Sequence, residues 1–289
     1  MIKYLKPLKV SSPKIRLGAK LDGGYVAPQI AFEKCNTLMA YGYGGDKTYE
    51  DDFVKKFNKN VYLFDHTVSD NEWTENLVSF YPEGLGPDNR DEAEKMYHMS
   101  QLTDNIETLN KQLSILKEKT DTKSLKSSIN SLEYFKSQLH SLSEVISLKG
   151  VREHYNDLNL EGEVFLKIDT EGAEYDYFYN TDIKDLSTFV TGMTIEFHNL
   201  DQPIYQTKLG IILEKFKDYF ILTHLHGNNW GGEITLGSYS IPRVLELSFV
   251  NKKYADGAEI DTTSYPIPDL DYPNNPDIPD CNMEFLNQI

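Results

Sequence analysis

The sequence of 289 residues predicts an α/β fold with a doubly wound, mostly parallel sheet and a helical-hairpin insertion. Short apolar runs that suit strands alternate along the chain with amphipathic stretches that suit helices. The clearest run, at 164–168, is mostly apolar and carries a β-branched residue at each end. Such a run is typical of a parallel strand that is buried on both faces.

The chain opens with a glycine-rich stretch in which Gly23-Gly24 is a turn signal, so we expect a hairpin there. A strand at 37–41 follows and runs into Gly42-Tyr43-Gly44-Gly45-Asp46. Glycines directly after a strand let the backbone approach a ligand, with the N-terminus of a helix, here 49–57, behind them. The motif falls short of the full dinucleotide fingerprint.

A second strand, at 61–64, ends in Asp65-His66. An acid at the end of the second strand is where a Rossmann-like site holds a ribose diol. The glycine turn and this acid together therefore predict an adenosine-type ligand at this edge of the sheet. The alternative for Asp65 is a turn-forming residue whose side chain bonds the nearby backbone.

Residues 91–146 differ in character from the rest of the chain. Leucine and isoleucine recur every three or four residues in two stripes, Leu102 to Leu116 and Leu125 to Ile146, with a polar stretch between them. This pattern predicts an antiparallel helical hairpin with a coiled-coil seam. One interpretation is that the two stripes pack on each other and on the sheet. The other is that the hairpin is an oligomerisation arm, and on this interpretation we expect a homo-oligomer.

The second half of the chain continues the alternation. The patterns predict helices at 151–158, 175–178 and 208–219 and strands at 189–197, 220–225 and 244–250. From Tyr265 the chain is rich in Pro, Asp and Asn, so we expect an extended tail, ordered only where Tyr272 or Phe285 docks. We therefore divide the chain into a sheet domain (1–90 and 147–264), the insertion (91–146) and the tail (265–289).

Composition narrows the classes of function. The formal net charge is −16, which argues against a protein that binds nucleic acid or an anionic membrane. Cys35 and Cys281 lie far apart in sequence and suggest a reducing compartment. Residues 1–10 lack the apolar core of a signal peptide, and no run is long enough to span a bilayer, so we expect a cytoplasmic protein.

Polar side chains follow three predicted strands: Asp169 after the first, Glu196 and His198 at the next, and His226, Asn228 and Asn229 at the third. Ligands in open α/β sheets sit at these carboxyl ends, so we expect the side chains to converge. Asp169, Glu196 and His226 are the ligand types of a divalent cation, Mg²⁺ or Mn²⁺. The structural alternative is that the residues after Asp169 cap the next helix and that the histidines are hydrogen-bonded structural groups.

At these residues the chain resembles the FkbM-type S-adenosylmethionine-dependent methyltransferases. The matching pieces are Arg16-Leu17-Gly18 with Asp22-Gly23-Gly24-Tyr25-Val26, Tyr41 to Asp46, Phe64-Asp65-His66-Thr67, Leu166 to Glu174, Ile195 to His198, and His226 to Asn229. They span most of the chain outside the insertion and the tail. The strand that ends in Asp169-Thr170-Glu171-Gly172-Ala173-Glu174 is the most specific of them.

The resemblance implies a Rossmann-like methyltransferase fold and transfer of a methyl group to a hydroxyl, often on a sugar. It implies that Gly42, Gly44 and Asp46 line the methionine end of S-adenosylmethionine, that Asp65 takes the ribose hydroxyls and that His66 lies near the adenine. By analogy, the acceptor is a nucleotide-activated hexose or heptose of a surface polysaccharide. The helical insertion departs from the family pattern.

The residues fit that chemistry. The sulfonium is an activated donor, so the protein must mainly align an acceptor oxygen and remove its proton. We expect His198 to act as the base, with His226 second, and a cation on Asp169, Glu196 and His226 to lower the pKa of the acceptor hydroxyl.

Two rival functions remain. One is an NAD-dependent oxidoreductase or epimerase, which the absence of a full GxGxxG and of a Tyr-x-x-x-Lys pair disfavours. The other is a non-catalytic scaffold that acts through the helical hairpin, in which the polar strand ends would be dispensable.

Overall fold

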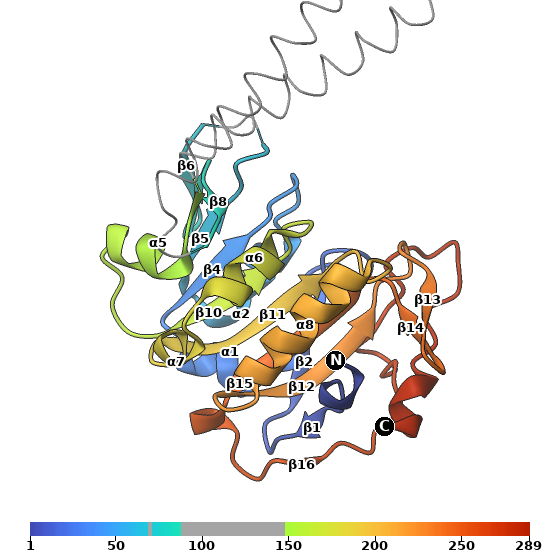
Figure 1. Ribbon diagram of the computed structural model, residues 1–289. Helices are drawn as coiled ribbons and strands as arrows, with labels where there is room; N and C mark the ends of the chain where they lie inside the picture. Colours follow the sequence, from blue (N-terminus) through green and yellow to red (C-terminus); the bar gives the residue numbers. More distant parts are fainter. Residues whose placement is uncertain (69–70, 88–147) are drawn as a thin grey trace, which may run out of the picture. The chain divides into compact units, whose positions relative to one another are not determined.

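The structure is a computed structural model that describes residues 1–68, 71–87 and 148–289. Its centre is a mostly parallel sheet of eight strands, so the predicted α/β class is confirmed (Figure 1). The strands are β4 (Thr37–Tyr41), β5 (Asn60–Phe64), β6 (Trp73–Glu75), β7 (Val78–Tyr81), β10 (Val164–Ile168), β11 (Val190–Phe197), β12 (Phe220–Gly227) and β15 (Leu245–Asn251). The strands predicted at 37–41 and 164–168 have the observed bounds.

The order of the strands is β12-β15-β11-β10-β4-β5-β7-β6. Neighbouring strands from β11 to β7 are parallel, whereas β15 is antiparallel to both β11 and β12, and β6 is antiparallel to β7. The chain builds the sheet outward from β4 to β7, then returns and builds it the other way from β10. The point of reversal lies between β4 and β10, where ligands bind in doubly wound sheets. Tyr41, Phe64 and Ile168 are paired in register there, so the carboxyl ends of β4, β5 and β10 are level, and β11, whose Ile195 pairs with Ile168, runs on to Phe197.

The remaining elements are short or lie on the faces of the sheet. The helices are α1 (Gln29–Lys34), α2 (Thr48–Phe57), α5 (Val151–Asp157), α6 (Ala173–Asn180), α7 (Ile183–Leu186), α8 (Pro203–Phe216), η1 (Ile2–Tyr4), η3 (Lys252–Tyr254) and η4 (Glu284–Gln288). The small paired strands are β1 (Leu8–Lys9) with β16 (Glu259–Ile260), β2 (Lys14–Leu17) with β3 (Tyr25–Pro28), β8 (Gly84–Leu85) with β9 (Leu148–Lys149), and β13 (Glu233–Leu236) with β14 (Tyr239–Pro242).

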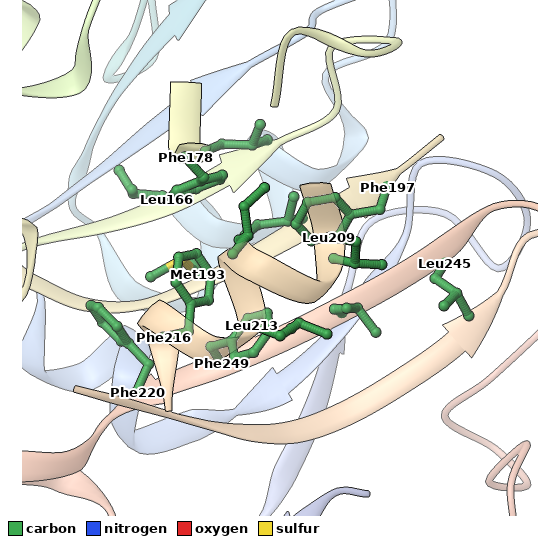
Figure 2. Packing of buried hydrophobic residues seen from close by; sticks show 14 of the residues in the cluster. Leu166, Phe178, Met193, Phe197, Leu209, Leu213, Phe216, Phe220, Leu245 and Phe249 are labelled. Atoms are coloured by element: carbon green, nitrogen blue, oxygen red, sulfur yellow. The ribbon is translucent and has the colours of Figure 1, made fainter. Parts of the chain in front are cut away.

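Helices cover both faces of the sheet, as a doubly wound fold requires (Figure 1). On one face α8 packs beside α6, and Figure 2 shows Leu209 and Phe216 of α8 pointing toward Phe197 of β11 and Phe249 of β15. Burial of one such side chain contributes roughly 1.5–3 kcal/mol. The helix begins earlier than the predicted 208 because Pro203 stands in its first turn, where a missing N–H costs nothing.

The opposite face is covered by α1, α2 and the β2–β3 hairpin that Gly23-Gly24 predicted. Strand β3 lies against β11, β12 and β15. The polar side of β15, which alternates with its apolar side, is therefore buried: Glu246 is 5 % and Ser248 3 % exposed. Buried polar groups need partners, and the hairpin and the tail supply them.

The tail packs over far more of its length than the two docking points that we expected. Asp271 pairs with His224 at 2.8 Å and Asp280 pairs with His226 at 3.1 Å. Met283, Phe285 and Leu286 are buried in the larger core cluster. The tail is ordered because its acids and amides satisfy buried polar groups of β12 and β15, which its composition alone does not reveal.

The insertion predicted at 91–146 lies outside the described residues, so the coiled-coil hairpin and the oligomer remain predictions. The described residues before and after it run side by side, since the N–H of Gly86 donates to the carbonyl of Lys149 at 3.0 Å. Among the helices of the described part of the chain, none is long and apolar enough to cross a membrane.

Asp261, just after β16, anchors the approach to the tail. It is 5 % exposed and accepts hydrogen bonds from Lys14 (2.7 Å), from the hydroxyl of Tyr265 (2.9 Å) and from the N–H of Thr263 (2.9 Å). Burial alone would raise the pKa of Asp261, but the bonds from Lys14 and Thr263 outweigh it and hold the pKa below its ordinary 3.8. A carboxyl with a depressed pKa stabilises the fold above its ordinary pKa, and that contribution is lost as the pH falls through the depressed value.

We therefore expect Asp261→Asn to lower the free energy of unfolding by about 1.5–3 kcal/mol at pH 7. The difference from the wild type should shrink below the ordinary aspartate pKa of 3.8, because Asp261 of the unfolded wild type then takes up a proton that the folded protein does not bind. Urea denaturation at pH 7 and pH 3 measures it, with the exposed Asp256→Asn as the control. An equal difference at both pH values would contradict the assignment.

Candidate active site

The glycine turn after β4 holds three strand ends together. Gly42 has a φ of +89°, and a Cβ there would lie 1.7 Å from the carbonyl oxygen of Asp169. The N–H of Gly42 donates to the carbonyl of Phe64, and the N–H of Asp169 donates to the carbonyl of Tyr41, each at 3.0 Å. Only glycine allows this approach, which places the turn between the ends of β5 and β10.

Asp65, at the end of β5, fastens the other side of the turn. Its Oδ2 accepts the N–H groups of Tyr43 and Gly44, both at 2.9 Å, and its Oδ1 accepts the N–H and hydroxyl of Thr67 at 2.8 and 2.6 Å. Burial works to raise the pKa of Asp65, but these bonds lower it, so the carboxylate is charged at neutral pH. The turn-forming alternative for Asp65 is therefore observed.

A first cavity of about 330 Å³ opens at this point of the sheet. All five residues that we expected at the cofactor line it: Gly42, Gly44, Asp46, Asp65 and His66. Its wall carries many carboxylates and, among the residues that line it, one lysine. The carboxylates are those of Asp22, Asp46, Glu50, Asp65, Asp169 and Glu171, and the lysine is Lys167. The cavity is therefore strongly electronegative.

A second cavity, of about 370 Å³, shares Asp22, Asp169 and Glu171 with the first. Its other lining residues are Glu196, His198, Asn199, Asn228, Trp230, Gly231, Arg243 and Val244. Trp230 is 64 % exposed, so much of its ring is available to a ligand. Because the two cavities share a wall at Asp169, ligands in them would lie next to each other.

His198 stands at the centre of a cluster of acids. Its Nε2 lies 3.7 Å from Asp169 Oδ1 and 3.8 Å from Glu196 Oε1, and its Nδ1 lies 3.2 Å from Glu174 Oε1. Burial opposes the charged ring, but the hydrogen bond to Glu174 and the charges of Glu196, Glu174 and Asp169 raise the pKa of His198 to about 9. Ligand atoms of Asp169, Glu196 and His198 all lie within 4.8 Å of one another, as a cation site requires.

Tyr25, from the β2–β3 hairpin, reaches the same acids. Its hydroxyl lies 2.8 Å from Glu196 Oε2 and 3.0 Å from Asp169 Oδ2. Asn228 donates to Glu196 Oε1 at 2.7 Å. Burial, and then the charges of Asp169 and Glu246, raise the pKa of Glu196 well above its ordinary value. Like charges held this closely favour uptake of a proton or of a cation.

The structure does not bring His226 to this cluster. Its Nδ1 lies 3.1 Å from Glu246 Oε2, and its Nε2 lies 3.1 Å from Asp280 Oδ1. Burial opposes the charge, but Glu246 and Asp280 raise the pKa of His226 to about 10. The reason is the sheet order, because β15 lies between β11 and β12 and pairs Glu246 with both Glu196 and His226. His198 takes the place in the cluster that we expected for His226.

Three groups of the site escaped the sequence analysis: Asp22, Tyr25 and Glu174. Asp22 and Tyr25 belong to the glycine-rich stretch that we predicted as a hairpin and counted among the family-like motifs without giving it a role, and nothing in it indicates that the hairpin crosses to the strand ends. Glu174 is one of the residues after Asp169 for which helix capping is the structural alternative, and it does accept the N–H of Gly172 at 2.8 Å. It also accepts the backbone N–H of His198 at 3.2 Å, so it positions the imidazole as well.

Gly42 and Gly44 form a matched pair for testing the turn. We expect Gly42→Ala to lower the free energy of unfolding by at least about 2 kcal/mol, because its Cβ meets a backbone carbonyl that cannot rotate away. Gly44→Ala meets no atom within 4 Å, and its φ of +53° costs alanine only about 1 kcal/mol. Urea denaturation of the two variants measures the difference. Equal losses would show that the close approach at Gly42 does not hold the strand ends.

We compared the chain with protein-family models, with curated proteins and with solved structures, and none of them matches it. The two cavities and the cluster of acids around His198 are therefore the features of the chain that indicate a function.

Proposed function

We propose that the chain is an S-adenosylmethionine-dependent O-methyltransferase that acts on a sugar hydroxyl with the help of a divalent cation. The observation that carries the proposal is a carboxylate-lined cavity at the glycine turn that adjoins a second cavity containing an imidazole. One cavity suits a cationic nucleoside donor, and the other suits an acceptor that must lose a proton.

The charge of the first cavity favours S-adenosylmethionine over NAD. The donor carries a sulfonium and an ammonium against one carboxylate, whereas the pyrophosphate of NAD carries two negative charges. A pyrophosphate needs the free N–H groups of a helix N-terminus. Here Asp46 accepts the N–H of Thr48 at 2.9 Å, so a carboxylate already occupies the start of α2. Six carboxylates and one lysine in the wall would repel the phosphates further.

The second cavity has the features of a sugar site. An exposed indole offers an apolar face to the C–H groups of a sugar ring, and the amides of Asn199 and Asn228 suit its hydroxyls. The finer proposal, a nucleotide-activated hexose or heptose of a surface polysaccharide, follows from the family resemblance. Its phosphates would need a cation here, because four acids and one arginine, Arg243, line the cavity.

The chain's own residues can perform the transfer. The acceptor oxygen forms a bond to the methyl carbon as the carbon–sulfur bond breaks, so the two cavities must align donor and acceptor. Glu174 pairs with Nδ1 of His198 and leaves Nε2 toward the cavity, which is the orientation that a base requires. Asp169 and Glu196 would hold Mg²⁺ or Mn²⁺ beside His198, and the cation when bound lowers the pKa of a hydroxyl, while Nε2 of His198 stays free to take the proton. The charges of Asp169 and Glu196 help to raise the pKa of His198, so their neutralisation favours the neutral ring.

Calorimetric titration tests the cofactor. We expect micromolar binding of S-adenosylhomocysteine and no binding of NAD at the same concentrations. Asp65→Asn should weaken S-adenosylhomocysteine binding by about tenfold or more, because an amide cannot accept all four hydrogen bonds that shape the turn. Asp51→Asn, which changes an exposed acid on α2 outside the cavity, is the control. Binding of NAD, or no binding of S-adenosylhomocysteine to the folded chain, would contradict the proposal.

Titration of Mn²⁺ into the chain tests the cation. We expect binding that Glu196→Gln weakens by about tenfold or more, because the variant loses a charged ligand. Asp280→Asn removes a partner of His226 and leaves the cluster of Asp169, Glu196 and His198 untouched, so it should bind Mn²⁺ as the wild type does. If Glu196→Gln binds Mn²⁺ unchanged, the cluster does not hold the cation.

A further inference from the structure

Glu50 is a buried acid in the wall of the first cavity, and the proposed function gives it no role so far. It lies in the first turn of α2 and is 1 % exposed. Its Oε1 has no hydrogen-bond partner among the described residues. Burial raises the pKa of Glu50 to about 7, although the charge of Lys167 opposes the rise. A buried acceptor without a partner destabilises the fold, so the fold alone gives no reason for a carboxylate here.

Lys167 lines the same cavity from β10 and is 5 % exposed. Its ammonium donates to the carbonyl of Gly42 at 2.7 Å and lies 3.9 Å from Asp169 Oδ2. A lysine has three N–H donors, so this set leaves donor capacity for a ligand. Glu50 and Lys167 form no ion pair with each other. The wall of the cavity therefore contains one buried acid and one buried base that are not paired with each other.

We propose that Glu50 binds the α-ammonium group, and Lys167 the α-carboxylate, of the methionine part of S-adenosylmethionine. The inference rests on the proposed function and deepens it, because it names the two groups that recognise the amino-acid end of the donor. A zwitterion satisfies both side chains at once: the ammonium fills the empty acceptor of Glu50, and the carboxylate accepts from Lys167. The glycine turn in the wall of the same cavity lets the ligand come close to the backbone.

The structural alternative is that Glu50 is a protonated core residue of α2. The two explanations differ in what they predict for ligands. A core residue affects every ligand of the cavity through the stability of the fold. A residue that binds the ammonium affects only ligands that carry one.

Calorimetry with three ligands separates these cases: S-adenosylhomocysteine, its decarboxylated form, which keeps the amine, and 5′-methylthioadenosine, which lacks the whole amino-acid part. We expect Glu50→Gln to weaken S-adenosylhomocysteine by about ten- to hundredfold and to leave 5′-methylthioadenosine within about twofold. Lys167→Gln should weaken S-adenosylhomocysteine but not its decarboxylated form. Asp51→Asn, one residue from Glu50 but exposed, should change none of the three.

The outcomes separate the two proposals. If the wild type binds S-adenosylhomocysteine and Glu50→Gln binds it equally well, the role of Glu50 is overturned and the proposed function stands. If the wild type does not bind S-adenosylhomocysteine, both are overturned. If Glu50→Gln fails to fold, the test uses the wild type and an analogue of S-adenosylhomocysteine in which hydrogen replaces the amino group. We expect the wild type to bind this analogue more weakly than S-adenosylhomocysteine, and equal affinity would overturn the inference.

Discussion

The contact between Gly42 and the carbonyl of Asp169 determines where the groups of both cavities lie. A side chain at Gly42 would push the ends of β4 and β10 apart, because its Cβ would lie 1.7 Å from that oxygen. With glycine the strands stay paired to their last residues, and Asp169 stands in the wall between the two cavities. Asp65 then fixes the far side of the same turn through two backbone N–H groups. The site is thus built on strand ends, which are rigid, rather than on long loops.

Burial of like charges is the second constraint, and it explains why distant segments belong to the site. Glu196 and Glu246 face each other across β11 and β15 and are 2 % and 5 % exposed. Two buried acids that lie this close together need hydrogen-bond donors or positive charges around them. Tyr25 and Asn228 donate hydrogen bonds to Glu196. Glu246 pairs with the imidazole of His226 and accepts a hydrogen bond from the amide of Asn274. The hairpin and the tail are therefore held in place by the same charges that form the site.

The sequence predicts what depends on neighbouring residues and misses what depends on the order of strands in the sheet. Apolar runs locate β4 and β10, and the carboxyl ends of parallel strands bring Asp169, Glu196 and His198 together. The prediction for His226 was wrong because β15, which comes late in the chain, lies between β11 and β12. His226 is therefore one strand farther from Glu196 than we expected. The sequence also does not reveal the contacts of Tyr25 and of the tail, because their partners are more than 40 residues distant in sequence. The stripes at 91–146 stay a prediction, outside the described residues.

Under the proposed function, the acids of the first cavity also bear on turnover. Methyl transfer converts a sulfonium into a neutral thioether, so the donor loses one positive charge while it remains in the same pocket. At an effective dielectric constant of about 20, two unit charges roughly 6 Å apart interact by about 3 kcal/mol. A wall of carboxylates therefore binds the donor more strongly than the product, which shares every other group with it. Glu50 and Lys167 act differently, because the zwitterion that they would bind is the same before and after transfer. The amino-acid end then supplies constant affinity, and the acidic wall supplies the difference that releases the product.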